Sequence, residues 1–93
     1  MSSILNTYNR KKIAFTKGKG AFLYGTNGKK YLDFVQGIAV NCLGHANNYL
    51  INSISKQARK LWHVSNVFII PEQERLAKRI TQKTFADYVF FQK

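Results

Sequence analysis

Two histidines, His45 and His63, are the side chains of this sequence best suited to acid–base catalysis or metal binding. The further ligands that a zinc site needs are not evident near either histidine, and the chain has only one cysteine, Cys42. No nucleophile is paired with either histidine. The sequence therefore predicts no catalytic residue and no metal ligand, and it favours structural roles for both histidines.

Gly18 and Gly20 match the start of a glycine pattern that binds the phosphates of dinucleotides. That pattern follows a strand and needs a third glycine. Here the third glycine is absent, and the two glycines precede a predicted strand. They are therefore interpreted as a turn that leads into a hairpin.

The clearest local structure in the sequence is a β-hairpin over residues 21–35. Two aromatic-rich runs flank Asn27-Gly28, a pair typical of the φ > 0 positions of a tight turn. Residues 36–47 show neither helical nor strand periodicity and are interrupted by Gly37 and Gly44. A buried loop is predicted there.

An amphipathic helix is predicted to begin at about Asn48. Lys56, Arg59 and Lys60 lie in its last turns, where positive side chains favour the negative end of the helix dipole. Its apolar stripe, expected to be buried, consists of Leu50, Ile54, Ala58, Leu61 and Trp62. Residues 63–70 then form a short link.

A second helix is predicted to open with Pro71, because proline followed by Glu72 and Glu74 is typical of a first helical turn. A favourable ion pair is expected between Glu74 and Lys78. The expected buried stripe consists of Leu76, Ala77 and Ile80. Residues 88–91 form a wholly apolar run, which predicts a buried strand.

Composition and charge narrow the classes of protein to which the chain could belong. Its 93 residues are 45% hydrophobic, which is typical of a folded domain or of part of one. The net charge of +11 makes nucleic acid or another polyanion a candidate partner. The basic residues are scattered, however, and the longest run is Arg10-Lys11-Lys12, so nucleic acid is not favoured. A small basic module that binds a polyanion remains the alternative function.

The same composition bears on the cellular location of the chain. The lone Cys42 cannot form an internal disulfide bond, so nothing indicates an oxidising compartment. No apolar run approaches the ~18 residues that a membrane span needs, and no secretion signal is evident at the N-terminus. A cytoplasmic protein without a membrane partner is expected.

A series of short segments extends along nearly the whole chain in a characteristic order. The segments are Thr7–Arg10, Gly18–Gly20, Gly28–Phe34, Gly37–His45, Pro71–Glu74 and Ala86–Phe91. In order and spacing they resemble the N-terminal part of the class III pyridoxal-phosphate-dependent aminotransferases. The stretch Gly37-Ile38-Ala39-Val40-Asn41 favours the acetylornithine branch of that family.

This resemblance implies an α/β fold, the incomplete N-terminal portion of a fold-type I pyridoxal-phosphate-dependent transferase. Residues 1–47 would supply a hairpin and loop of the small domain. Residues 48–93 would supply two helices and the start of a large-domain strand. Full-length relatives are expected to be homodimers that use pyridoxal phosphate to transfer an amino group between N-acetylornithine and 2-oxoglutarate in arginine biosynthesis.

The departures from the family lie at the end of the sequence. The family continues with Asn-Ser-Gly and a helix, whose N-terminus holds the cofactor phosphate, whereas here Phe91 is followed by Gln92-Lys93. The segments that supply the Schiff-base lysine and the partner of the cofactor ring nitrogen are also missing. The expectation is a truncated or split enzyme that binds no cofactor and is inactive alone, with a complementing C-terminal chain as a candidate partner.

The resemblance also implies two substrate-binding candidates, Tyr8 and Ile38. Tyr8 falls where related ω-aminotransferases place an aromatic residue of the substrate pocket. Ile38 falls at a position that is aromatic in ornithine aminotransferases and apolar in the acetylornithine enzymes. The alternatives are a surface aromatic for Tyr8 and a core residue for Ile38. For Ser65-Asn66, a structural role in the link and a role near the dimer interface both remain open.

Overall fold

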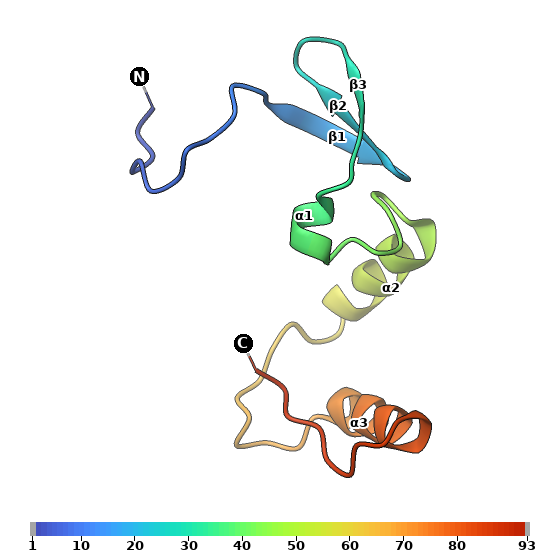
Figure 1. Cartoon of the computed structure of the whole chain (residues 1–93). Coiled ribbons are helices and arrows are strands. Elements are labelled where there is room, and N and C mark those ends of the chain that lie inside the picture. Colours follow the sequence, from blue (N-terminus) through green and yellow to red (C-terminus); the bar gives the residue numbers. More distant parts are fainter. Residues whose placement is uncertain (1, 93) are drawn as a thin grey trace. The chain divides into compact units, whose positions relative to one another are not determined.

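The computed structural model describes residues 2–92, so Met1 and Lys93 lie outside the described residues. The chain divides into two compact units, Met1–Lys56 and Gln57–Lys93 (Figure 1). The first unit contains a three-stranded sheet, a short helical turn and most of the helix Asn48–Ala58, and the second contains the helix Pro71–Lys83. No helix within residues 2–92 has the length and apolar character that a membrane crossing requires.

The sheet of the first unit is antiparallel and has the strand order β1-β2-β3. Its strands are β1 (Phe15–Lys19), β2 (Phe22–Gly25) and β3 (Lys30–Leu32). The pairing of β2 with β3 confirms the predicted hairpin. The sequence did not predict β1, which pairs with β2 and brings the Phe15 ring edge-on to the Tyr31 ring at 5.5 Å between centroids.

The loop of the hairpin is longer than the expected two-residue turn. Gly28 has φ of +75°, but Asn27 is not among the positive-φ residues, so the expectation of two such positions is wrong for Asn27. The Gly28 N–H donates to the Gly25 carbonyl at 3.1 Å, and the Lys29 N–H donates to Asn27 Oδ1 at 3.0 Å. The loop between β2 and β3 therefore has four residues, 26–29, and only Gly28 adopts a left-handed backbone conformation.

Residues 36–47 contain an element that the sequence did not predict. Helix α1 (Gln36–Ala39) is a single turn in which Gln36, Gly37, Ile38 and Ala39 all have φ between +53° and +63°. These values describe a left-handed turn, which hydrophobic periodicity does not reveal. The expected burial is wrong for this unit, because Ile38 and Val40 are both largely exposed.

Both predicted helices are present. Helix α2 (Asn48–Ala58) begins where expected but ends before Leu61 and Trp62, so these two residues lie beyond its stripe. Helix α3 (Pro71–Lys83) has its proline in the first turn, as predicted. The side chains of the two expected stripes are exposed or only half-buried, since α2 and α3 contain no buried residue.

The ion pair on α3 differs from the predicted pair. Glu72 pairs with Arg75 at 3.0 Å, and no ion pair joins Glu74 to Lys78 within the described residues. Both partners of the observed pair are largely exposed, and such pairs are worth little. The spacing of Glu74 and Lys78 permits a pair, but the small energy of an exposed pair does not hold two flexible side chains together.

The apolar run at residues 88–91 forms no strand, so that element of the sequence prediction is wrong for this chain. A strand needs a hydrogen-bonded neighbour, and the sheet in residues 2–92 is made only by β1, β2 and β3. Tyr88 and Phe90 are instead almost fully exposed. Within the described residues no hydrophobic side chain is buried, which leaves both units without a core of their own.

Candidate functional site

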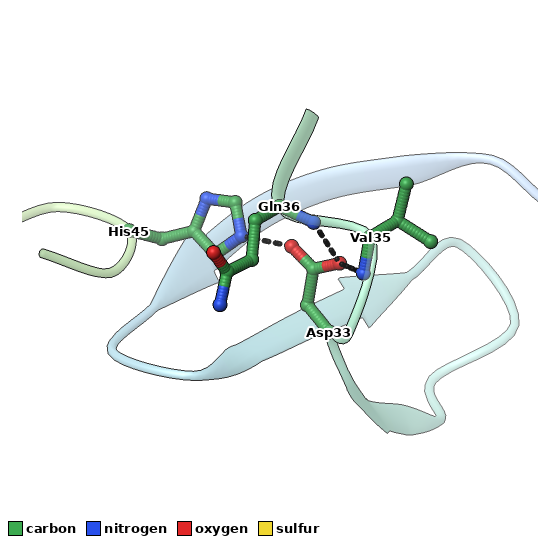
Figure 2. Close-up of polar contacts among 4 residues, drawn as sticks. All are labelled: Asp33, Val35, Gln36 and His45. Atoms are coloured by element: carbon green, nitrogen blue, oxygen red, sulfur yellow. Dashed lines mark hydrogen bonds and ion pairs between the residues drawn. The ribbon is translucent and has the colours of Figure 1, made fainter. Parts of the chain in front are cut away.

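Asp33 and His45 form a compact polar cluster at the end of the sheet (Figure 2). The side chain of Asp33, which follows β3, is only 6% exposed, and that of His45 is 20% exposed. Asp33 Oδ2 lies 2.6 Å from His45 Nε2. Asp33 Oδ1 accepts hydrogen bonds from the N–H groups of Val35 at 3.0 Å and Gln36 at 2.9 Å. One carboxylate therefore contacts residues on both sides of α1.

The hydrogen bonds around Asp33 determine its protonation. The hydrogen bond from the Gln36 N–H makes the largest contribution to lowering the pKa of the Asp33 carboxyl below its ordinary value. The hydrogen bond with His45 lowers that pKa further. Asp33 is therefore ionised at neutral pH. Because an ionised carboxylate can only accept hydrogen bonds, His45 Nε2 must be the donor.

His45 reaches Asp33 because its backbone pairs with the turn between β1 and β2. The Gly20 N–H donates to the His45 carbonyl at 2.9 Å, and the His45 N–H donates to the Gly20 carbonyl at 2.8 Å. A Cβ on Gly44 would lie 2.9 Å from the Gly20 carbonyl oxygen, and a Cβ on Gly18 would lie 2.6 Å from the His45 ring. Glycine is therefore required at 18 and 44 by close approach.

The interpretation of Gly18 and Gly20 as a turn is correct for one of them. Gly20 has φ of +57° and lies in the turn between β1 and β2. Gly18 lies inside β1, where it pairs with Leu23 and leaves room for the His45 ring. A dinucleotide site is not built here, because the backbone N–H of Gly20 is already bonded to His45.

The left-handed turn α1 lies between Asp33 and His45 in the sequence. Three of its four residues, Gln36, Ile38 and Ala39, are not glycine. The left-handed conformation costs a residue with a side chain about 1–2 kcal/mol. The turn is closed by hydrogen bonds from the N–H groups of Ala39 to Val35 O and of Val40 to Gln36 O, at 3.0 Å each. Its conformation is thus held by polar contacts at both ends.

Comparison with known protein families decides what kind of chain carries this cluster. The model of the class-III aminotransferases matches residues 5–93. The chain belongs to the class-III aminotransferase family. It is 54% identical over 91 residues to the acetylornithine aminotransferase of Rhodobacter capsulatus, which covers 98% of this chain and 23% of that protein. It is 50% identical to the acetylornithine aminotransferase of Agrobacterium fabrum, over 95% of this chain and 22% of that protein.

Solved structures of related aminotransferases agree with this assignment. The N-acetylornithine aminotransferase of Stenotrophomonas maltophilia is 35% identical with a TM-score of 0.72, over 81% of this chain and 21% of that one. The acetylornithine aminotransferase of Elizabethkingia anophelis is 25% identical with a TM-score of 0.80, over 89% of this chain and 22% of that one. The predicted fold class, the N-terminal part of a larger α/β aminotransferase, is confirmed. The chain spans less than a quarter of the length of these relatives.

A hollow of about 230 Å³ lies beside the Asp33–His45 pair. Its lining residues are Gly20, Ala21, Asp33, Gln36, Asn41, Cys42, Leu43, Gly44 and His45. Pyridoxal phosphate needs a lysine for its imine and free backbone N–H groups for its phosphate. The hollow has no lysine, its Gly20 and His45 N–H groups are bonded to each other's carbonyls, and Asp33 would repel a phosphate. The residues of this hollow therefore do not fit the cofactor.

The two substrate-binding candidates lie in the first unit but not in one hollow. Tyr8 is 72% exposed, and the guanidinium of Arg10 lies 5.6 Å from the centre of its ring. The hollow of about 470 Å³ at Tyr8 is lined by residues 6–10 and does not include Ile38. Ile38 is 85% exposed, so within this unit it is not a core residue. A substrate-binding role for Tyr8 and Ile38 stays a prediction.

The second unit contains the other histidine of the chain, His63. No group of three or more histidine, cysteine or acidic side chains within residues 2–92 could hold a metal ion. His63 lines a local hollow of about 260 Å³ beside Trp62 and Gln73. In the link, Asn66 Oδ1 accepts a hydrogen bond from Gln73 Nε2 at 3.5 Å, which favours a structural role within this unit. The interface role of Ser65-Asn66 stays open.

Sequence reasoning missed Asp33 as a partner of His45. The two residues are 12 positions apart and do not share a helix or a strand, so no periodicity of the sequence relates them. The available signal was the set of glycines at 18, 20 and 44, since a residue without a side chain allows two backbone segments to approach closely. The hydrogen bonds that His45 makes within this unit favour the structural role predicted for it.

Proposed function

We propose that this chain is the N-terminal part of an acetylornithine aminotransferase that transfers an amino group between N-acetylornithine and 2-oxoglutarate. The observation that carries the proposal is the 54% identity to the Rhodobacter capsulatus acetylornithine aminotransferase over 98% of this chain. Pyridoxal phosphate is the proposed cofactor of the complete protein. It would be bound by residues outside this chain, and the 93 residues alone would be inactive.

The exposed surface of the chain supports a role as part of a larger protein. Residues 1–93 expose 9321 Å². Two compact units of the sizes of Met1–Lys56 and Gln57–Lys93 would together expose only about 6,600 Å². The difference of about 2,700 Å² is roughly three times the area that one partner buries in a standard interface. Burial of so large an area against other parts of a protein is typical of the interior of one folded subunit or of an obligate complex.

The partner that we propose is therefore the remaining part of the aminotransferase, on the same polypeptide or on a complementing C-terminal chain. The uncovered large apolar side chains of the second unit are Leu61, Trp62, Val67, Phe68, Ile69, Leu76, Phe85, Tyr88 and Phe90. In the assembled protein these side chains would form part of a common core, and residues 88–91 would gain the strand neighbour that they lack here. The complete protein would act as a cytoplasmic homodimer.

Tyr8 and Ile38 are the proposed substrate-binding residues of the complete protein. Both side chains are exposed in this unit and are free to line a pocket whose other walls come from elsewhere. An aromatic ring at Tyr8 would pack against the aliphatic or acyl part of the substrate. The apolar side chain of Ile38 would leave room for the acetyl group, where an aromatic residue would not.

A chimera tests this proposal directly. The 91 residues of this chain that match the Rhodobacter capsulatus enzyme would replace the matched segment of that enzyme. The chimera is expected to bind pyridoxal phosphate, observed by its absorbance, and to transfer the amino group of N-acetylornithine to 2-oxoglutarate with a kcat/KM comparable with that of the parent. The 93-residue chain alone is expected to give no product in the same assay.

A matched control separates a failed exchange from a wrong function. The corresponding segment of the Oceanobacillus iheyensis acetylornithine aminotransferase, which is 49% identical to this chain, would be exchanged in the same way. If the Oceanobacillus chimera is active and the chimera with this chain is not, the proposed function is wrong. Turnover by the isolated chain would contradict the proposed inactivity.

A further inference from the structure

We propose that Asp33 and His45 are a positioning pair, which holds the left-handed turn α1 so that Ile38 is presented in one orientation. This inference rests on the proposed function, because it assigns to the pair a role in placing a substrate-binding residue. Neither residue would touch the substrate. Each would act through the backbone conformation of residues 36–39.

The contacts of Asp33 reach both ends of the segment that carries Ile38. At the start of this segment, Asp33 Oδ1 accepts hydrogen bonds from the N–H groups of Val35 at 3.0 Å and Gln36 at 2.9 Å. Beyond its end, Asp33 Oδ2 accepts the Nε2–H of His45 at 2.6 Å (Figure 2). The charge of the carboxylate strengthens all three hydrogen bonds. The side chain of Asp33 therefore links the two ends of the segment that contains the turn.

The backbone of His45 anchors this loop to the sheet. Its N–H and C=O groups both pair with Gly20, at the turn between β1 and β2. Asp33 itself follows β3 and donates its own N–H to the Ala21 carbonyl at 2.8 Å. The segment that carries Ile38 is thus attached to the three-stranded sheet at both ends, and its position relative to the sheet is defined.

Packing does not explain why the turn is left-handed. A β-branched residue with positive φ is a true outlier, and Ile38 has φ of +63° and ψ of +60°. Its side chain is 85% exposed, so burial within this unit does not offset the strain. Strained conformations persist when surrounding contacts over-determine them, and they gather at functional sites. Here the over-determining contacts are those of Asp33 and His45, together with the backbone hydrogen bonds that close the turn.

The first test uses the 93-residue chain and three variants. Asp33→Ala and His45→Ala each remove one member of the pair, whereas His45→Gln keeps a side-chain N–H donor near the position of Nε2. Backbone coupling constants and nuclear Overhauser effects report the sign of φ at Ile38 and Ala39. The positive φ values are expected in the unmodified chain and in His45→Gln, and they are expected to be lost in both alanine variants while the β2–β3 pairing remains.

The second test uses the active chimera described above. Asp33→Ala is expected to raise the KM for N-acetylornithine about tenfold, the scale of coupling between residues in one network, and to change kcat much less. Ile38→Gly is expected to raise the KM similarly. If the pair acts through Ile38, adding Asp33→Ala to Ile38→Gly will raise the KM little further.

The outcomes distinguish this inference from the proposed function. Positive φ at Ile38 in Asp33→Ala, or its absence in the unmodified chain, would overturn the positioning role and leave the aminotransferase assignment standing. Additive effects of Asp33→Ala and Ile38→Gly on the KM would also overturn it. An unmodified chimera without activity would count against the proposed function, while the measurement of φ would still decide the role of the pair.

Discussion

Replacing Gly44 with alanine is expected to break the backbone pairing between Gly20 and His45. Gly44 has φ of +78°, and an added Cβ would lie 2.9 Å from the Gly20 carbonyl oxygen and 3.0 Å from its carbon. These atoms belong to the backbone of a turn that is paired on both sides, so they cannot swing away as a flexible side chain could. The segment that carries His45 must move outward instead.

The size of the effect follows from two contributions. The left-handed conformation of an alanine costs about 1–2 kcal/mol. Stretching the two hydrogen bonds between Gly20 and His45 costs about 0.5–1.5 kcal/mol for each bond. Gly44→Ala should therefore destabilise the paired state by about 2–5 kcal/mol in all.

Gly28→Ala is a matched control for this prediction. Gly28 has φ of +75°, close to that of Gly44, but an added Cβ would meet nothing within 4 Å. This variant should carry only the conformational cost of about 1–2 kcal/mol. The difference between the two variants isolates the close approach of residue 44 to the backbone of Gly20.

Amide hydrogen exchange in the 93-residue chain measures that difference. Protection of the Gly20 and His45 N–H groups should fall roughly 5- to 150-fold further in Gly44→Ala than in Gly28→Ala, since the extra cost is about 1–3 kcal/mol. Equal protection in the two variants would refute the argument from close approach. Rapid exchange of both N–H groups in the unmodified chain would refute the pairing itself.

Three further predictions concern charge. Because the pKa of folded Asp33 is depressed, its contacts add stability above the ordinary aspartate pKa of about 3.9, and this stability is lost as the pH falls through the lower folded value. Protection of the Gly20 N–H should therefore decrease in acid, and a His45→Ala variant should shift this decrease to higher pH. Glu72→Gln should reduce the stability of α3 by about 0.5 kcal/mol through the helix dipole, measured by circular dichroism, whereas Asp87→Asn outside the helix should have no such effect. Duplex DNA should bind no more tightly to this chain than to an unstructured peptide of equal charge, and tighter binding with a steep salt dependence would favour the polyanion-binding alternative.

Local chemistry explains which elements could be predicted. Pro71 followed by acidic residues signals a helix start whatever surrounds it, and α3 begins at that proline. Aromatic runs around Asn27-Gly28 likewise indicate a hairpin, which is present as β2 and β3. Strand β1 has no such signal, because the run Phe15–Lys19 contains a glycine and two lysines and becomes a strand only by pairing with β2.

The candidate site depends on contacts that no local pattern encodes. Asp33 meets His45 only after β3 and the turn between β1 and β2 have formed, since both residues are attached to the sheet through backbone hydrogen bonds. Positive φ at Ile38 contradicts the preference of a β-branched residue, so local propensity predicts the wrong conformation there. Contacts between distant residues decide this turn, and its conformation could not be read from the sequence of the turn itself.

The apolar stripes predicted for the two helices have the expected spacing, but their side chains are exposed or only half-buried in the structure. Leu50 and Ile54 lie on one face of α2, and Leu76 and Ile80 lie on one face of α3, at the spacing that burial requires. Amphipathic spacing indicates that one face of a helix is suited to burial. It does not indicate which part of the protein buries that face. Here the relatives are more than four times as long as the matched segment, so most of the surface that could cover these faces lies in the part of the family that this chain does not contain. An exposed apolar stripe thus indicates that another surface covers it in the complete protein. In this chain the exposed stripes of α2 and α3 agree with the assignment to a larger aminotransferase.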